Sequence, residues 1–206
     1  MAIKSMLSLT TTNLGIDNLD KVDLTVKAGE VLCLSGPSGS GKSRLLRAIA
    51  DLEPHSGSAS LDNRKQDSMP GHCWRRQVML VPAQSAWWYE TAGAHLAKPM
   101  PQALLALGFP EEADGWQMAT LSTGEKQRLA LVRALSYEPR ALLLDEPTAN
   151  LDENSTLKTE AFLLEVIREK QYPVIWVAHS PAQIRRVANR YFAIEDSRLK
   201  EQEIPL

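Results

Sequence analysis

The chain has 206 residues, of which 44% are hydrophobic, and its formal net charge at pH 7 is −2. This length is enough to bury one full core, so we expect a single domain over residues 1–206. No apolar run approaches the ~20 residues needed to span a bilayer, and the start lacks the continuous apolar core of a signal peptide. The small negative charge gives no general attraction to nucleic acid, which we do not expect as a partner. We therefore expect a cytoplasmic protein that reaches a membrane only through a partner.

The first segments predict an antiparallel β edge beside a main sheet. Residues 3–9 and 22–26 both show partial alternation of apolar and polar side chains. Residues 27–30 then turn the chain into a short apolar run, 31–34. This run predicts a buried central strand.

A glycine-rich turn follows that strand and matches the phosphate-binding loop pattern: Gly36, four residues, Gly41, Lys42 and Ser43. The glycines allow a tight turn in which backbone N–H groups point at phosphate oxygens, and the next helix adds its N-terminal dipole. Lys42 supplies a charge to the outer phosphates, and Ser43 supplies a hydroxyl to Mg²⁺. The alternative is an ordinary glycine turn, against which the flanking strand and helix argue. The predicted nucleotide-binding residues are Gly36, Pro37, Ser38, Gly39, Ser40, Gly41, Lys42, Ser43 and Arg44.

The next segments predict a helix and two strands. Residues 43–52 carry apolar side chains at helical spacing, the last of them Leu52, and Gly57 begins another short strand. The run that starts at Arg75, RRQVMLVPAQ, predicts a strand that ends at Pro82 and Gln84.

An aromatic cluster follows this strand. Trp87, Trp88 and Tyr89 stand together in a segment bounded by turn formers. These rings either pack a small helical subdomain or form a surface that docks a partner, because large exposed aromatic side chains commonly anchor interfaces. The pattern leaves both interpretations open.

Residues 121–135, LSTGEKQRLALVRAL, predict a capped amphipathic helix. Ser122 and Glu125 have the spacing of a capping box. The predicted buried face consists of Leu129, Leu131, Val132 and Leu135.

Residues 141–152, ALLLDEPTANLD, predict a buried strand that ends in two acids, Asp145 and Glu146. Both acids then lie at the carboxyl edge of the sheet, where α/β folds bind ligands. Asp145 suits Mg²⁺ coordination, and Glu146 can orient an attacking water. His179, at the end of a later strand, is expected at the same edge. The remaining predicted elements are a helix at 152–169, a strand at 173–178, a helix at 181–188 and a last strand at 191–195.

Together these motifs resemble an ATP-binding-cassette ATPase, the nucleotide-binding subunit of an ABC transporter, over essentially the whole chain. The resemblance rests on the ordered set GPSGSGKS, Gln84, LSTGE followed by KQR, LLLDEPTANLD and His179. It implies an α/β fold with a P-loop NTPase core, a mostly parallel sheet, an antiparallel N-terminal β edge and a short inserted α-helical subdomain at about residues 85–135. Among subfamilies, the sequence is most similar to the small bacterial cassettes of the iron-export type.

The resemblance also implies cofactors, partners and residue roles. Two copies would dimerise head to tail, with each ATP between the phosphate loop of one copy and the signature loop of the other. The signature residues acting in trans would be Leu121, Ser122, Thr123, Gly124 and Glu125, and Asp152 would cross the dimer interface. Mg²⁺ would be held by Ser43, Gln84 and Asp145, and the catalytic residues would be Glu146 as general base, His179 and Gln84. Integral membrane permease subunits would be the other partner.

Some features depart from the family pattern. No aromatic residue stands between Leu9 and Ile16 to stack on adenine, so we hypothesise a weak preference for ATP over GTP. Thr123 stands where the signature usually has glycine. Arg44 replaces the usual threonine, and its side chain either reaches phosphate or points to solvent. Only a short polar tail follows the last predicted strand, so we expect no C-terminal regulatory domain.

Two functions remain open at this point. The first is ATP hydrolysis that powers a membrane transporter whose spanning subunits are separate chains, through ATP-driven dimer closure. The second is a non-transport motor that acts mechanically or as a signalling device on a membrane partner. Work on nucleic acid is disfavoured, because the chain has neither a long coiled-coil insertion nor a second cassette.

Overall fold

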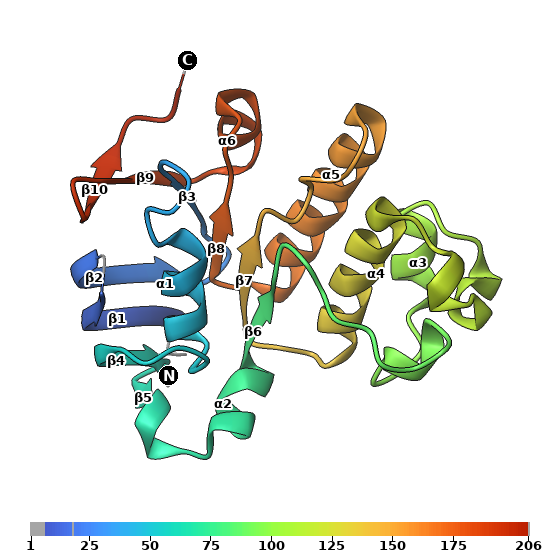
Figure 1. Ribbon diagram of the computed structural model, residues 1–206, viewed down its shortest axis with the longest axis horizontal. Coiled ribbons are helices and arrows are strands. Elements are labelled where there is room, and N and C mark those ends of the chain that lie inside the picture. The colour runs from blue at the N-terminus through green and yellow to red at the C-terminus, as the bar shows by residue number, and fades with distance from the viewer. Residues whose placement is uncertain (1–6, 18, 206) are drawn as a thin grey trace, which may run out of the picture.

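The computed structural model describes residues 7–17 and 19–205. Within these residues the strands form two sheets, with the orders β2-β1-β4-β5 and β10-β9-β3-β8-β7-β6. The strands are β1 (Ser8–Ile16), β2 (Leu19–Lys27), β3 (Val31–Ser35), β4 (Ser56–Leu61), β5 (Arg64–Lys65), β6 (Val78–Val81), β7 (Ala141–Asp145), β8 (Val174–Val177), β9 (Arg190–Glu195) and β10 (Arg198–Gln202). The helices are α1 (Lys42–Ile49), α2 (Gly71–Gln77), α3 (Pro101–Ala106), α4 (Thr123–Ser136), α5 (Glu153–Lys170) and α6 (Pro181–Val187), as labelled in Figure 1.

The larger sheet is parallel from β9 to β6, and only β10 pairs antiparallel at its edge. The smaller sheet is antiparallel throughout. The predicted α/β class, with a mostly parallel sheet and antiparallel N-terminal strands, is confirmed. The antiparallel strands form a sheet of their own, and α1 packs between the two sheets because its apolar side chains share one core with both.

The central strands are buried on both faces. In β8, Val174 and Trp176 face the core that contains α4 and α5, whereas Ile175 and Val177 face the core that contains α1. Figure 1 shows α1 on one side of β8 and β7, and α4 and α5 on the other. Burial on both faces explains why the parallel strands are continuous apolar runs in the sequence.

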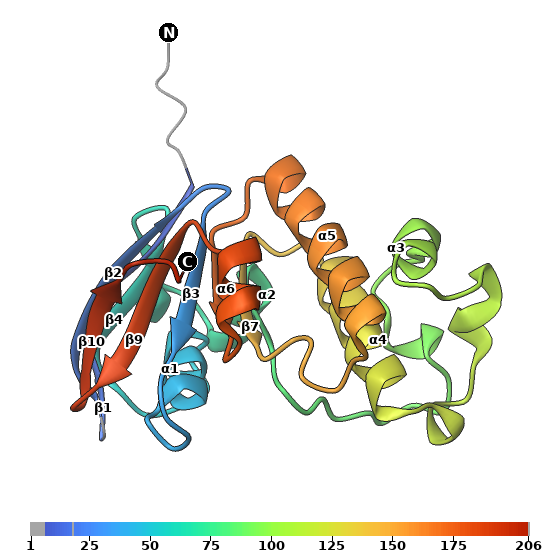
Figure 2. The ribbon, with the colours of Figure 1, turned by 90° about the horizontal axis from the view of Figure 1, so that it is seen from above.

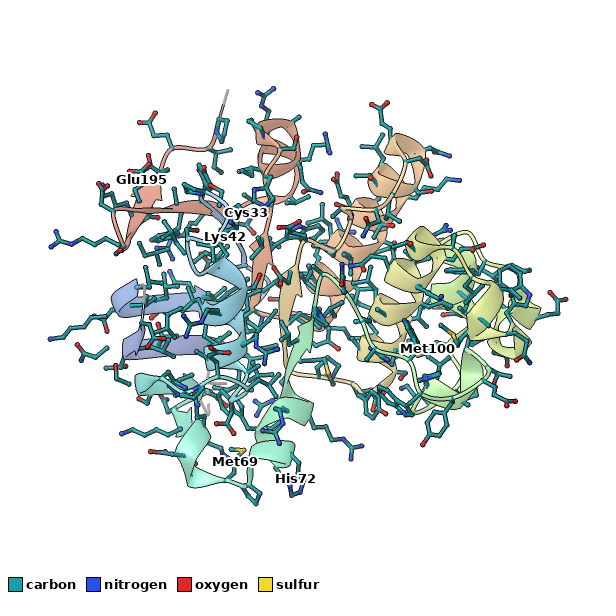
Figure 3. All side chains as sticks on the ribbon, in the orientation of Figure 1. Cys33, Lys42, Met69, His72, Met100 and Glu195 are labelled. Atoms are coloured by element: carbon teal, nitrogen blue, oxygen red, sulfur yellow. The ribbon has the colours of Figure 1, made fainter. Side chains whose placement is uncertain are left out.

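The chain between β6 and β7 is mainly helical. Figures 1 and 2 show α3 at one end of the molecule, opposite β1 and β2, and Figure 3 places Met100 in the same region. An isolated bridge between Thr91 and Gln117 closes this part of the chain. The predicted buried face of α4 is confirmed, since Leu129, Leu131, Val132 and Leu135 are all buried. We propose that residues 85–135 form the helical subdomain.

Two predicted element boundaries before residue 80 are wrong. Residues 75–77 end α2 and do not begin a strand, because the helix buries the ring of Trp74, whose indole N–H donates to the carbonyl of Ile49 at 2.8 Å. Leu52 does not extend the buried face of α1, which ends at Ile49, and its side chain is exposed.

Both ends of the chain also differ from the prediction. Part of the predicted strand at residues 3–9 lies outside the described residues, and β1 continues to Ile16. The strand at 191–195 is not the last, because the expected polar tail contains β10, paired with β9 from Arg198 opposite Glu195 to Gln202 opposite Tyr191. No helix in the described part of the chain has the length and apolar character needed to cross a bilayer.

Candidate functional site

The glycine-rich turn between β3 and α1 has the backbone of a phosphate-binding loop. Gly36 has φ +144°, and a Cβ placed on it would lie 2.9 Å from the carbonyl oxygen of Ile194. Gly41, the N-cap of α1, has φ +102°. Residues with side chains rarely adopt these conformations, so glycine is required where the loop turns into the helix.

Lys42 lies inside this loop, at the N-terminal end of α1 (Figure 3). Its side chain is buried, and the ammonium group donates to the carbonyl oxygens of Gly36 and Pro37, both at 2.9 Å. Burial lowers the pKa of Lys42, and the negative charges of Glu146 and Asp145 oppose that change. The loop therefore encloses a fixed cation next to two acids.

Asp145 ends β7 beside the loop, as predicted. It is 6% exposed, and it accepts a hydrogen bond from Ser43. Its Oδ1 atom is buried and has no hydrogen-bond partner among the described residues. Burial raises the pKa of Asp145, and the hydrogen bond from Ser43 opposes that change. A buried carboxylate oxygen without a partner beside a hydroxyl is a ready oxygen donor for a cation.

Glu146 and His179 form a hydrogen-bonded pair at the same edge of the sheet. Glu146 Oε1 and His179 Nε2 are 2.7 Å apart. Glu146 has φ +49°, an unfavourable conformation for a residue with a side chain, so its surroundings hold it in place. His179 follows β8, the strand next to β7, which explains why two residues 33 positions apart meet.

These residues surround one cavity of about 230 Å³, which we call the loop cavity. It is lined by Ser38, Gly39, Gly41, Lys42, Ser43, Arg44, Glu146 and His179. The structure thus brings together the phosphate loop, the second acid and the histidine that the sequence predicted at one sheet edge. The cavity combines backbone donors, a cation and a carboxylate, which is the equipment for binding and transferring a phosphoryl group.

Gln84 follows Ala83, whose backbone N–H donates to Asp145. Gln84 is exposed on the segment after β6 and does not line the loop cavity.

The predicted signature residues begin α4 and also do not line the loop cavity. Ser122 is the N-cap, and the predicted capping box is present: its backbone N–H donates to Glu125 Oε2 at 2.8 Å, and its Oγ accepts from the Glu125 N–H at 3.2 Å. Asp152 caps α5 by accepting from the N–H of Ser155 at 2.9 Å. The start of α4 lies close to the loop before α5, since a Cβ on Gly124 would lie 2.9 Å from the carbonyl oxygen of Asn150.

A buried polar network behind the acidic loop was not predicted. Glu160 on α5 is 3% exposed and accepts two hydrogen bonds from Arg186, at 2.6 and 2.8 Å. Gln183 donates to Glu160 and also to the hydroxyl of Thr148, both at 2.8 Å. The sequence feature that could have predicted this network is a charged residue on the apolar face of a helix. Glu160 stands three and seven residues before the buried Leu163 and Ile167, and therefore on the same face.

Arg44 is half-buried, lines the loop cavity and is paired with two carboxylates. Its Nε donates to Glu53 Oε1 and its Nη2 donates to Asp17 Oδ2, both at 2.9 Å. Asp17 lies in the turn between β1 and β2, 27 residues away in the sequence, so no local pattern could have indicated this contact.

Comparison with known proteins places this geometry in a family. A family model described as ABC transporter matches residues 19–149. The Fe(3+) ions import ATP-binding protein FbpC of Streptomyces coelicolor is 36% identical over 204 residues, which cover 91% of this chain and 58% of that protein. The aliphatic sulfonates import ATP-binding protein SsuB 3 of Nocardia farcinica is 38% identical over 184 residues, which cover 87% of this chain and 72% of that protein. The probable amino-acid import ATP-binding protein YxeO of Bacillus subtilis is 35% identical over 210 residues, which cover 91% of this chain and 83% of that protein.

A solved structure agrees on the fold. The structure of a bacterial Atm1-family ABC exporter with ATP bound superposes with a TM-score of 0.82 at 24% identity, covering 98% of this chain and 39% of that one. This chain thus spans little more than half of the iron importer subunit and less than half of the exporter. Because the family model covers most of the sequence and the relatives match nearly all of it, the chain belongs to the ABC transporter family of ATP-binding proteins.

Proposed function

We propose that this chain hydrolyses ATP and thereby powers a membrane transporter as its nucleotide-binding subunit. The observation that carries the proposal is the loop cavity, where Lys42, Glu146 and His179 line one space beside the phosphate loop. The relatives are named as ATP-binding proteins for the import of iron(III), sulfonates and amino acids. Their names share ATP binding and import, and we assign to this chain the ATP-driven step of such a transport cycle.

Each residue at the cavity then has a defined part in phosphoryl transfer. The loop N–H groups and Lys42 bind the phosphates and offset their charge. Glu146 accepts a proton from the attacking water, and its hydrogen bond to His179 orients the carboxylate. His179, half-exposed at the cavity, is free to contact the γ-phosphate through the same ring. The protein contributes position and charge and forms no covalent intermediate.

The residues beside the loop fit Mg²⁺. Ser43 and Asp145 are oxygen donors, and the unpartnered Oδ1 of Asp145 faces no competing donor among the described residues. Gln84, on the exposed segment after β6, is the third proposed donor. Bound there, Mg²⁺ would supply charge stabilisation to the phosphates.

Hydrolysis of ATP by the purified chain, with and without the metal, tests this function. We expect excess EDTA to lower the rate by at least about 100-fold, because the metal offsets several kcal/mol of transition-state charge. MgCl₂ added back should restore the rate, and Asp145→Asn should raise the Mg²⁺ concentration required. An unchanged rate in EDTA, or no hydrolysis of ATP under any condition, contradicts the proposal.

We further propose that the complete site contains a second copy of the chain. Ser122, Gly124 and Asp152 do not line the loop cavity of their own chain. They lie together at the starts of α4 and α5, where a partner's phosphate loop can reach them in a head-to-tail dimer. ATP would then close the dimer, and hydrolysis would release it.

A groove of about 700 Å³ between α2, β6 and α4 is the proposed docking site for a permease subunit. Its floor is apolar, with Met79, Leu80 and Ala134, and its rim carries Arg76 and Trp88. The two interpretations of the aromatic cluster apply to different residues. Trp87 packs against the core, whereas Trp88 is 63% exposed and available to a partner. Docking there would hold the chain at the cytoplasmic face of the membrane.

We expect Trp88→Ala to lower the recovery of a multi-span membrane protein on this chain from detergent-solubilised membranes of the source cells. Loss of an exposed aromatic anchor from an interface typically costs about 2 kcal/mol or more, roughly 30-fold in affinity. Tyr89→Ala is the matched control, since Tyr89 is 54% exposed next to Trp88 but does not line the groove. Equal recovery with Trp88→Ala and the unmodified chain would remove this groove from the docking site.

A further inference from the structure

The guanidinium group of Arg44 is paired with two carboxylates at the edge of the phosphate loop. Glu53 binds its Nε and Asp17 binds one Nη2 hydrogen, so two carboxylates fix the plane of the group from different directions. Glu53 is itself held by Arg47, at 3.2 Å. Among the hydrogen bonds of the described residues, Arg44 uses two of its five N–H donors. Its remaining donors and its flat face are available to a ligand.

Arg44 lines one of two cavities that share residues of the phosphate loop, and its partner Asp17 lines the other. It lines the loop cavity, which also contains Glu146 and His179. A second cavity of about 700 Å³, here called the outer cavity, is lined by Asp17, Pro37, Ser38, Gly39, Ser40, Ile194, Glu195, Asp196 and Ser197. Ser38 and Gly39 line both cavities, and the Arg44–Asp17 ion pair joins a residue of one to a residue of the other.

The direction of the bound nucleotide follows from this arrangement. Glu146 and His179 are proposed to face the γ-phosphate, so the nucleoside, attached through the α-phosphate, lies at the opposite end of the loop. The turn that carries Asp17 is close to that end, because a Cβ on Gly41 would lie 3.3 Å from Ile16 Cδ1. Arg44 is in the first turn of α1, where side chains tilt towards the helix N-terminus and hence towards the loop.

The walls of both cavities contain no Phe, Tyr or Trp side chain among the described residues. A nucleobase needs a flat surface to replace the water on its faces, and the guanidinium group of arginine provides one. Lys42 cannot serve, because its ammonium group is a point charge with no flat face. Arg44 is therefore the planar cation at the nucleoside end of the loop.

We propose that Arg44, fixed by Asp17 and Glu53, stacks on the nucleobase of the bound nucleotide and so determines how the chain selects its nucleotide. The inference rests on the proposed function, since it assigns the nucleoside end of the same site. A guanidinium face contacts the π system common to all bases and not the edge groups that distinguish them. Adenine and guanine are therefore held about equally, and ATP and GTP are both substrates.

The experiment compares ligands that have the nucleoside with one that lacks it. Dissociation constants for ATP and GTP, and the inhibition constant of inorganic tripolyphosphate, are measured for the full chain and for Arg44→Ala. We expect Arg44→Ala to weaken ATP and GTP binding alike, by about tenfold, because stacking of one base contributes on that order. Tripolyphosphate should bind the variant and the unmodified chain equally. In turnover, KM for ATP should rise while kcat stays unchanged.

Two further variants control the comparison. Arg47→Ala removes the neighbouring arginine, which also pairs with Glu53 but lines neither cavity. The affinities for ATP, GTP and tripolyphosphate should therefore stay unchanged. Asp17→Asn changes a side chain that is 83% exposed, so folding is preserved, and it weakens one of the two anchors of Arg44 by removing its charge. We expect it to weaken the binding of ATP and GTP by about threefold, because part of the stacking contribution is lost. The binding of tripolyphosphate should be unchanged.

The contrary outcomes are separable. If Arg44→Ala weakens tripolyphosphate as much as ATP while the melting temperature is unchanged, Arg44 contacts phosphate and the proposal is wrong. If Arg44→Ala and Asp17→Asn change no nucleotide affinity, Arg44 only ties the β1–β2 turn to α1, and the proposal is again wrong. Failure of tripolyphosphate to compete with ATP in the unmodified chain would instead overturn the proposed nucleotide site itself.

Discussion

Glu146→Gln is expected to lower the rate of ATP hydrolysis by about 10²- to 10⁴-fold, the usual contribution of a general base, while ATP still binds. Glutamine has the shape of glutamate and retains a hydrogen bond to His179, but it cannot accept the proton of the attacking water. The phosphate loop and Lys42 are untouched by the change. The rate is measured as phosphate release at saturating ATP and Mg²⁺, and binding by equilibrium titration.

The same variant also tests the dimer. Because hydrolysis is proposed to release the closed state, Glu146→Gln with ATP should elute as a dimer in gel filtration, and without nucleotide as a monomer. Glu153→Gln is the matched control: Glu153 is an exposed carboxylate on the first turn of α5 and does not line the loop cavity. Turnover near the unmodified rate in Glu146→Gln would exclude Glu146 as the base.

Arg186→Met is expected to lower the free energy of unfolding by about 3 kcal/mol, because it removes the cationic partner of a buried carboxylate. Glu160 is 3% exposed and, among the hydrogen bonds of the described residues, would retain only the one from Gln183. Arg186 itself is 40% exposed, so removing it takes little apolar packing away. Urea unfolding at pH 7 measures the effect as a lower midpoint at unchanged slope.

Glu160→Gln provides the comparison. It keeps the size and the acceptor of the side chain and removes the charge, so we expect a loss of only about 1 kcal/mol, the value of an ordinary hydrogen bond. Combined with Arg186→Met, it should recover part of the stability, since no unpaired charge stays buried. If the double variant is as unstable as the sum of the two single variants, the cost does not come from a stranded carboxylate.

The elements that the sequence predicted best are those buried by regular packing. The strands β7 and β8 have apolar side chains on both faces, and α4 combines a capping box with a buried stripe. Elements on the surface were harder to predict. β10 pairs with one neighbouring strand, and its side chains are mostly polar and exposed. Its sequence therefore shows little alternation of apolar and polar residues from which a strand could be predicted. In α2, one buried side chain, Trp74, decides the conformation of a segment that otherwise merges into β6.

The candidate site divides in the same way. Residues within contiguous motifs, such as Lys42, Asp145 and Glu146, could be predicted because their spacing along the chain fixes their place at the sheet edge. The contact between Arg44 and Asp17 depends on how the β1–β2 turn folds over α1, which is set by tertiary packing. The roles of Ser122 and Asp152 across a dimer, and the similarity to iron-export cassettes, stay predictions.

The close approach of Gly124 to the backbone of Asn150 has a mechanical consequence. A Cβ at position 124 would lie 2.9 Å from that carbonyl oxygen, so the start of α4 packs closely against the loop that leads to Asp152. That loop is continuous with Glu146, through residues 147–151. In the proposed dimer, the starts of α4 and α5 would face the neighbour's nucleotide. The same loop connects them to Glu146, the proposed base of their own chain. If the proposed dimer forms, we expect ATP at one site to change the rate of hydrolysis at the other.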